Sequence, residues 1–396
     1  MTRPTLEVAD IFRAQGDAFA ESHRETVRFQ QLKVMRAITR CRTAALGGHI
    51  DRCHDATCPR CGDGISFNSC RNRACPKCQG QARQRWIAAR EQELLATSYF
   101  HVVFTLPHEL HGLIQQNTVK LYDLLFRAVA DTLLEVAANP DHLGAAIGFF
   151  AILHSWGQNL MFHPHIHCVV PAGGLSPDRT RWIRGSSTFF LPMDILREVF
   201  RGKFVEGLKE AFRLKHLTME GQIQHLARPN CFAAFIHKLY QHQWVVYPKA
   251  SFGSPEHVLR YLGRYTHRIA ISNQRLVSFD GNSVTFRWRD YAHGNKKRKM
   301  TLRAEEFIRR FLMHVLPKAF VRIRHFGFMA NYQRTASLDL CRELLGMAPL
   351  DRSSDPAPTP SPRVCPRCGG PMTVIERLTP AQIRWRFASA CFSDTS

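Results

Sequence analysis

The stretch HPHIHCVV, residues 163–170, carries three histidines at alternate positions and then runs into apolar residues. Side chains at alternate positions of a β-strand share one face of the sheet, so His163, His165 and His167 are predicted to point the same way. Adjacent imidazoles on one face can chelate a cation if a third ligand arrives from another segment. Pro164 separates the first two histidines, and proline fits best at strand starts or edges. We therefore expect His165 and His167 to be metal ligands, with His163 at the entrance to the strand.

The composition indicates a basic globular protein. The chain has 396 residues, enough for two or three domains, with 45% hydrophobic and 22% charged residues. Its 54 Lys and Arg outnumber 32 Asp and Glu, giving a net charge of +22, which is typical of proteins that bind polyanions such as nucleic acid. The longest apolar run, AAIGFFAIL at 145–153, is too short to span a bilayer, and no signal-peptide pattern opens the chain. We expect a cytoplasmic protein without a membrane partner.

Strand and helix patterns alternate without a regular βαβ period, which favours an α+β fold over a doubly wound sheet. Apolar periodicity predicts helices at 5–46, 81–97 and 193–216, and RLVSFDGNSVTFRWRDY at 275–291 reads as a hairpin that turns at Asp280–Gly281. The expected domains are a helical and zinc-binding module (1–98), an α+β domain (99–345), a Pro/Ser linker (346–363) and a short tail with a partial zinc knuckle (364–396).

Six cysteines within 26 residues predict a metal site: Cys53, Cys58, Cys61, Cys70, Cys75 and Cys78. Two of the pairs have the form C-P-x-C, a spacing at which both thiolates can bind one tetrahedral Zn²⁺. A cytosolic chain with 13 cysteines is more typical of metal binding than of disulfides. The pairs Cys58/Cys61 and Cys75/Cys78 can close a four-cysteine site of structural type, and a second metal that uses Cys53 and Cys70 stays open.

A further knuckle, Cys365-Pro-Arg-Cys368, lies in the tail. Its natural partner is another C-x-x-C pair, but only Cys391 follows it. Whether this tail folds is left open by the sequence.

The segment VLRYLGRYTHRIAIS, 258–272, places Tyr261 and Tyr265 four residues apart, on one face of a predicted helix. His257 lies four positions earlier on that face. Gly263 in mid-helix costs about 1 kcal/mol relative to alanine, which indicates a close approach by another group. Basic residues flank the tyrosines and follow the hairpin, and are predicted to hold backbone phosphates: Arg260, Arg264, Arg268, Lys296, Lys297, Arg298 and Lys299.

Together these residues suggest phosphoryl transfer. A divalent cation on His165 and His167 could polarise a phosphate, and a tyrosine hydroxyl could attack phosphorus to form a covalent phosphotyrosine. His257 or Gln158 could supply the third metal ligand, and we favour His257.

The motifs GGHI…CPRCG…NSCRNRACPKCQ, HSWGQNLMFHPHIHCVVPAGGLS, HVLRYLGRYTHRIAIS and RIRHFGFMANYQR resemble those of the IS91-type transposases. These are two-tyrosine enzymes with a His-hydrophobic-His (HUH) motif, here His165-Ile166-His167, and an N-terminal zinc-binding domain. The resemblance implies an HUH nuclease core of antiparallel sheet and packed helices, nicking of single-stranded DNA at element ends, a 5′-phosphotyrosine intermediate and rolling-circle transposition. It also implies Mg²⁺ or Mn²⁺ at the histidines, whereas imidazole preference alone suggests zinc.

The chain departs from the family pattern at Ala74, where many members carry a histidine, and this weakens the case for a second zinc in the N-terminal module. The tail does not clearly complete the family's C-terminal pattern. Three alternatives stay open: a plasmid rolling-circle replication initiator with the same chemistry, a histidine-triad nucleotide hydrolase, and a non-enzymatic zinc-dependent DNA-binding regulator.

Overall fold

The computed structural model describes residues 4–55, 58, 64–188, 190–250, 263, 269–290, 293–349, 363–365 and 367–386. Contacts divide the chain into two compact units. The first unit comprises Met1–Ala82, His267–Val315 and Asp351–Ser396, and the second comprises Arg83–Thr266 and Leu316–Leu350. The division differs from the expected domains, because residues 267–315 and the tail belong with the N-terminal module.

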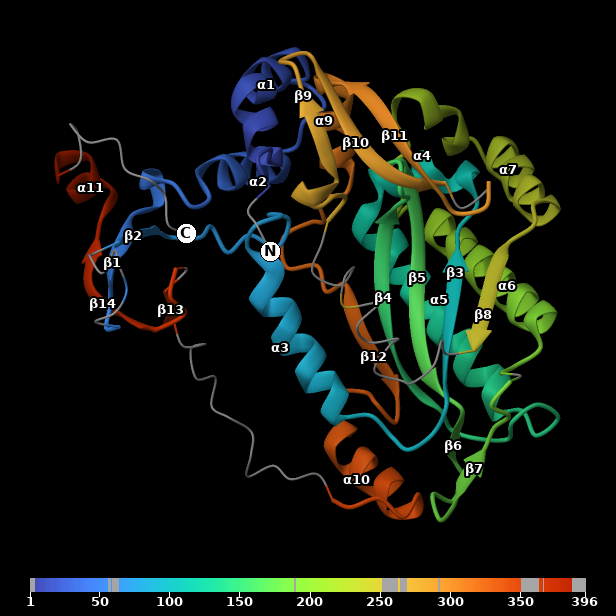
Figure 1. The fold of residues 1–396 in the computed structure, drawn as a ribbon. Coiled ribbons are helices and arrows are strands. Elements are labelled where there is room, and N and C mark those ends of the chain that lie inside the picture. Colours follow the sequence, from blue (N-terminus) through green and yellow to red (C-terminus); the bar gives the residue numbers. More distant parts are fainter. Residues whose placement is uncertain are drawn as a thin grey trace. The chain divides into compact units, whose positions relative to one another are not determined.

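A five-stranded sheet forms the centre of the second unit, in the order β12-β4-β5-β3-β8 (Figure 1). Every neighbouring pair is antiparallel. The strands are β3 (Tyr99–Thr105), β4 (Gly148–Trp156), β5 (Phe162–Pro171), β8 (Val245–Ala250) and β12 (Ile323–Gly327). The histidine stretch therefore lies on the central strand, and the antiparallel sheet implied by the family resemblance is confirmed.

One face of this sheet packs on α5 (Thr118–Ala138) and α6 (Met193–Arg213) (Figure 1). The ring of Phe104 on β3 meets Phe200 of α6 edge-on, with centroids 5.1 Å apart. Ile166, between the two histidines of β5, is fully buried. This face holds aromatic and aliphatic side chains that alternate with the histidines along the strands.

The opposite face carries the histidines and is met by α3 (Gln79–Gln92). Trp86 of α3 packs edge-on against Phe150 of β4, with ring centroids 5.7 Å apart. Phe150 belongs to a buried cluster with Tyr99, Ile152 and Val169, and Val169 has the same strand parity as His165 and His167. Because these residues share one side of the pleat, α3 lies on the histidine side of the sheet.

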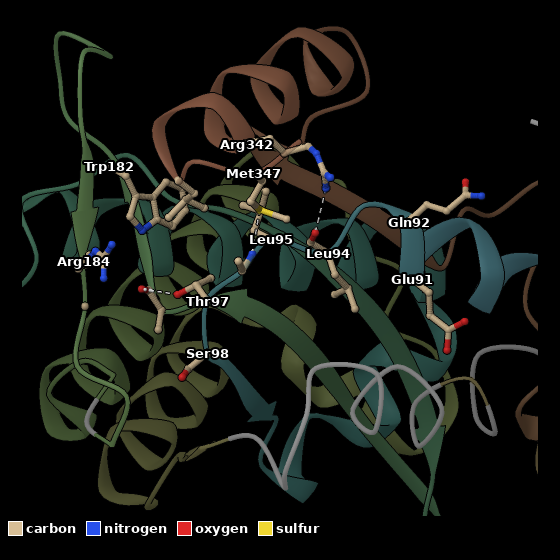
Figure 2. A pocket seen from close by; sticks show the side chains of 14 residues that line it. Glu91, Gln92, Leu94, Leu95, Thr97, Ser98, Trp182, Arg184, Arg342 and Met347 are labelled. Carbon is tan, nitrogen blue, oxygen red and sulfur yellow. Dashed lines mark hydrogen bonds between the residues drawn. The ribbon is translucent and has the colours of Figure 1, made fainter. Parts of the chain in front are cut away.

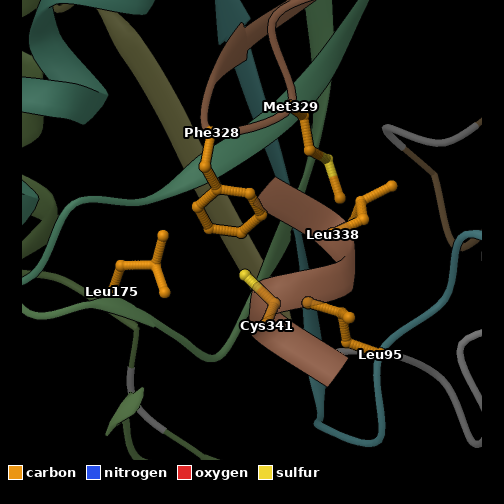
Figure 3. Close-up of a cluster of buried hydrophobic side chains, with 6 residues drawn as sticks. All are labelled: Leu95, Leu175, Phe328, Met329, Leu338 and Cys341. Carbon is orange, nitrogen blue, oxygen red and sulfur yellow. The ribbon is translucent and has the colours of Figure 1, made fainter. Parts of the chain in front are cut away.

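At the end of the sheet where β5 terminates, α10 (Arg334–Leu344) is fixed by a hydrophobic cluster. Figure 3 shows its side chains converging from separate segments: Leu95, Leu175, Phe328, Met329, Leu338 and Cys341. A small sheet of β6 (Gly173–Leu175) and β7 (Trp182–Arg184) follows β5. The second unit also contains the helices η2 (His108–Leu110), α4 (His111–Gln116), η3 (Gly221–Ala227) and α7 (Pro229–Gln241).

The first unit combines helices with two further sheets. The predicted helix 5–46 is two helices, α1 (Val8–Ser22) and α2 (Phe29–Arg40), and Phe12 of α1 packs edge-on against Phe311 of α9 (Ala304–Met313). The predicted hairpin is confirmed as β9 (Leu276–Phe279) and β10 (Ser283–Asp290), with Gly281 at φ +97° in the turn. A third strand, β11 (Lys296–Arg303), pairs with β10 and extends the hairpin. The short helix η4 (Asn273–Arg275) precedes β9.

The tail folds into the same unit. The other sheet has the order β13-β14-β1-β2, so β14 (Pro371–Leu378) pairs directly with β1 (Gly48–Cys53). The remaining elements are η1 (Ala44–Leu46), β2 (Gly64–Phe67), β13 (Arg363–Val364) and α11 (Pro380–Arg386). The tail thus supplies a central strand to the sheet that carries the N-terminal cysteines. Among the residues described in both units, no helix is long and apolar enough to cross a membrane.

Candidate metal and nucleic-acid site

Three imidazoles meet on the α3 side of the central sheet. His165 and His167 alternate along β5, and His154 of β4 is the direct cross-strand partner of His165. One ring nitrogen from each of the three lies within 4.8 Å of the others. The ring centroid of His154 is 4.4 Å from that of His167 and 5.4 Å from that of His165. The nitrogen separations are short enough for the three histidines to bind one cation.

The protein environment keeps these imidazoles neutral. Burial lowers the pKa of His154 and of His167 well below the ordinary value of 6.5, and neighbouring histidines lower it further. Burial also lowers the pKa of His165 to about 3, with a smaller contribution from His163. A neutral ring keeps a lone pair on one nitrogen, which is the form that binds metal.

Hydrogen bonds orient two of the rings. His165 Nδ1 lies 2.6 Å from the carbonyl oxygen of His163 and donates to it, which leaves Nε2 with the lone pair. His167 Nδ1 lies 2.7 Å from His101 Nε2 on the neighbouring strand β3. With the shared proton on His167 Nδ1, its Nε2 keeps the lone pair and can accept. Such outer partners fix the tautomer and the direction of a ligand.

The third imidazole differs from the expected ligand. The sequence favoured His257, which lies outside the described residues, with Gln158 as the alternative; Gln158 lies in the connection between β4 and β5. Among the described residues, the structure brings His154 beside the pair, a ligand candidate that sequence reasoning missed, and the role of His257 stays a prediction. The sequence did contain a signal for His154, which precedes His165 by eleven residues in what proves to be a hairpin. The strand expected at 145–153, however, ended one residue before His154.

The tyrosine segment is described only at its centre. Tyr261, Tyr265, Arg260, Arg264 and Arg268 lie outside the described residues. Gly263, between the tyrosines, is helical and buried, and a Cβ placed on it would lie 2.3 Å from Cδ1 of Ile87 on α3. The close approach inferred from this glycine is therefore confirmed, and the partner is the helix that covers the histidine face.

A four-cysteine cluster lies in the first unit. Sulfur atoms of Cys41, Cys70, Cys75 and Cys78 lie within 4.8 Å of one another. Cys78 Sγ is 3.3 Å from Cys41 Sγ and 3.5 Å from Cys70 Sγ, close to the separation of about 3.8 Å in a tetrahedral Zn–S₄ site. Hydrogen bonds from Cys41, Cys70 and Cys75 hold the pKa of the Cys78 thiol below its ordinary value. The donor set suits structural Zn²⁺.

The grouping of cysteines differs from the one expected from spacing. Cys75 and Cys78 cluster with Cys70 and with Cys41, the residue that caps the C-terminus of α2. They do not cluster with Cys58 of the first knuckle. Cys53 and Cys58 instead lie in a second cluster with Cys365 and Cys368. Cys61 lies outside the described residues. Sequence spacing identified the ligand type, but it could not show that β14 returns to β1.

Two family models match the segments that carry the histidines and the N-terminal cysteines. Residues 11–106, which include Cys41 and Cys78, match the IS91 family model described as "Transposase zinc-binding domain", and residues 148–336, which include the three histidines, match the model described as "Putative transposase". The chain is 49% identical over 389 residues to "Putative transposase y4qJ" of Sinorhizobium fredii, covering 95% of this chain and 96% of the relative. The chain belongs to the IS91-type transposase family.

A second relative is more distant. The transposase for insertion sequence element IS801 of Pseudomonas savastanoi pv. phaseolicola is 30% identical over 326 residues, which is 81% of this chain and 74% of that protein. No solved structure matches the chain.

In this transposase the basic run lies on an exposed strand. Lys296, Lys297, Arg298 and Lys299 open β11 and are all exposed. Arg298 pairs with Asp290 at 2.9 Å, which reduces its availability to other anions.

Two of these lysines share a face with arginines that sequence reasoning missed. Lys297 lies opposite Arg289 and Lys299 opposite Arg287 in the β10–β11 ladder, and both arginines are exposed. Like charges directly opposite one another destabilise a sheet unless an anion lies over them. This basic face, defined as Arg287, Arg289, Lys297 and Lys299, suits a phosphate backbone.

A cavity of about 810 Å³ lies at the opposite strand end from the histidines (Figure 2). It is lined by Leu94–Ser98 before β3, by Trp182 and by Met347, and Arg342 donates to the Leu94 carbonyl at 3.4 Å. Tyr99 pairs with Pro171 at this end of β3, whereas Thr105 pairs with His165 at the other. The cavity therefore belongs to a different region from the histidine site.

The contact between Gly263 and Ile87 predicts that the effect of Gly263→Ala on the free energy of unfolding depends on the residue at position 87. Gly263→Ala should lower the free energy of unfolding in the native background, because the new methyl group overlaps Ile87. In an Ile87→Ala background the same change should be neutral or stabilise by up to about 1 kcal/mol, because alanine favours the helix. Urea denaturation of the four proteins measures the coupling, expected at about 1–3 kcal/mol. Purely additive effects would contradict the contact.

Proposed function

We propose that this transposase nicks and rejoins single-stranded DNA at the ends of its element through a 5′-phosphotyrosine, and so drives rolling-circle transposition in the cytoplasm. The observation that supports this most strongly is the convergence of three neutral imidazoles on the sheet face that α3 covers, together with the contact of Gly263 on α3. Gly263, which stands between the two tyrosines in the sequence, thus contacts the helix that lies on the histidine face.

The histidine site fits a divalent cation. Three neutral nitrogen donors, two of them oriented by hydrogen bonds, suit a transition ion such as Mn²⁺ better than Mg²⁺, whose preferred ligands are oxygens. When bound, the ion supplies a Lewis acid that polarises the scissile phosphate. His154, His165 and His167 would hold it, and His101 acts only through His167, as a positioning residue.

The covalent step uses Tyr261 or Tyr265. The phenolic oxygen loses its proton and forms a bond to phosphorus while the bond from phosphorus to the 3′ oxygen breaks, and the released 3′ oxygen takes up a proton, so no net proton is gained or lost. The ester energy is kept in the phosphotyrosine, so a 3′-hydroxyl of another strand can reverse the step and join the DNA. Two tyrosines permit a second cleavage before the first is resolved.

Metal binding should depend on His154. His154→Ala removes one of three donors and should weaken Mn²⁺ binding by about 100-fold or more, beyond the 10–100-fold typical of lost outer partners. Isothermal titration with Mn²⁺ measures this. His163→Ala is the matched control, because His163 is exposed and holds His165 through its carbonyl, which the change preserves. Equal losses in both variants, or none in His154→Ala, would argue against the assigned donor set.

A covalent adduct should form with DNA from the element's ends. Single-stranded DNA labelled at its 3′ end, incubated with protein and Mn²⁺, should give a labelled protein band that survives denaturation, whereas a 5′ label should leave as a free, shorter strand. The double change Tyr261→Phe and Tyr265→Phe should abolish the band. Tyr332→Phe, at a residue that is 87% exposed, should keep it. Persistent absence of an adduct with the native protein would favour a DNA-binding regulator.

The basic face should contribute to the salt dependence of DNA binding. Changing the directly opposed pair Arg287→Gln and Lys299→Gln should reduce the slope of log affinity against log salt by about 0.7 for each lost phosphate contact. Fluorescence anisotropy over a salt series measures the slope. Lys203→Gln with Lys209→Gln on α6, which removes the same charge elsewhere, should leave the slope unchanged; an equal reduction there would mean that only net charge matters.

A further inference from the structure

The second cysteine cluster joins residues from the two ends of the chain. The sulfur atoms of Cys53, Cys58, Cys365 and Cys368 lie within 4.8 Å of one another. Cys53 Sγ and Cys368 Sγ are 3.5 Å apart, too far for a disulfide and close to the sulfur separation around a tetrahedral zinc ion. Cys53, Cys58 and Cys365 are buried, and Cys368 is exposed at the edge.

The backbone around the tail pair is folded as a metal-binding turn. Gly369 N donates to the Cys365 carbonyl at 2.9 Å, and Cys365 N donates to the Gly370 carbonyl at 2.8 Å. Gly370 N points at Cys368 Sγ from 3.3 Å, an interaction that stabilises a thiolate. Gly369 adopts φ +74°, which favours glycine. These bonds pre-orient both sulfurs toward one point.

The N-terminal side of the cluster is shaped to receive this turn. A Cβ on Gly370 would lie 2.9 Å from Cβ of Asp55, so the turn approaches the N-terminal segment more closely than any other residue type allows. His54 N donates to the Pro371 carbonyl at 3.1 Å, and Cys58 N donates to the Asp55 carbonyl at 3.1 Å. The four sulfurs are therefore held by backbone contacts from both ends of the chain.

Packing alone gives this region little stability. Among the described residues, the buried cluster here consists of Cys53, Cys58 and Cys365, with Met372 packed against it. Along β14, partly buried and exposed residues alternate until Leu378, the first buried position. Cys58 and Cys365 are separated by 307 residues, from 365 − 58, so closing this contact has a considerable entropic cost. A structural zinc ion supplies binding free energy where a hydrophobic core is small.

We propose that Cys53, Cys58, Cys365 and Cys368 bind a second Zn²⁺ that ties the tail to the N-terminal module. The matched zinc-binding domain ends at residue 106 and the matched transposase region at residue 336, so neither includes the tail pair. The site needs no ligand at position 74, where Ala74 is buried. The protein then holds two zinc ions, one in each four-cysteine cluster.

Zinc content tests the proposal. The full chain should contain two zinc ions per molecule by plasma mass spectrometry, and the pair Cys365→Ser and Cys368→Ser should contain one. Cys231→Ser, at a partly buried cysteine of α7 outside both clusters, should keep two. One zinc in the native protein, or two in the tail variant, would overturn the proposal.

A second measurement does not depend on the folding of a variant. A protease site inserted in the Pro/Ser stretch 351–362 allows the tail to be cut from the otherwise complete, zinc-loaded protein. The cut tail should co-elute with the rest of the chain on size exclusion, and should separate after treatment with a zinc chelator. Co-elution that survives removal of both zinc ions, or separation while two are bound, would contradict the zinc tie.

Discussion

The pairing of β4 with β5 is the interaction on which the histidine site depends. It sets His154 opposite His165, and because side chains alternate along a strand, a slip of one residue would turn His154 toward α5 and α6. The register is strongly specified, since Ile166 and Leu153 are fully buried on one face and Ile152 and Val169 on the other. A register irregularity between His154 and Trp156 comes only after the imidazoles have been aligned.

The burial of the histidines also controls their protonation. Desolvation, with smaller contributions from neighbouring histidines and from Arg322 near His154, lowers the pKa of His154 and His167, so the rings stay neutral and can donate their lone pairs. Lysines and arginines lie instead on exposed strands such as β11. There they can bind phosphates without placing positive charge next to the metal ligands.

Local patterns were sufficient to predict local structure. Alternation predicted β5 and its histidine pair, Asp280–Gly281 predicted the hairpin turn, and the knuckle spacings predicted thiolate ligands. The family resemblance is confirmed.

What could not be predicted depends on pairings between distant segments. His154 becomes a candidate ligand only through the β4–β5 register, and Cys41 only through the position where α2 ends. The division of cysteines between two clusters follows from the return of β14 to β1. The roles of Tyr261 and Tyr265 stay predictions.

The assembly of the first unit from three separated segments has a consequence for biosynthesis. Its N-terminal cysteines leave the ribosome long before Cys365 and Cys368 are translated, whereas the last residue of the second unit, Leu350, is translated before both tail cysteines. The second unit can therefore fold on the nascent chain, but β1 can pair with β14 only after the whole second unit has been translated. A polypeptide terminated between residue 350 and β14 would carry the complete histidine sheet but would lack the strand that pairs with β1.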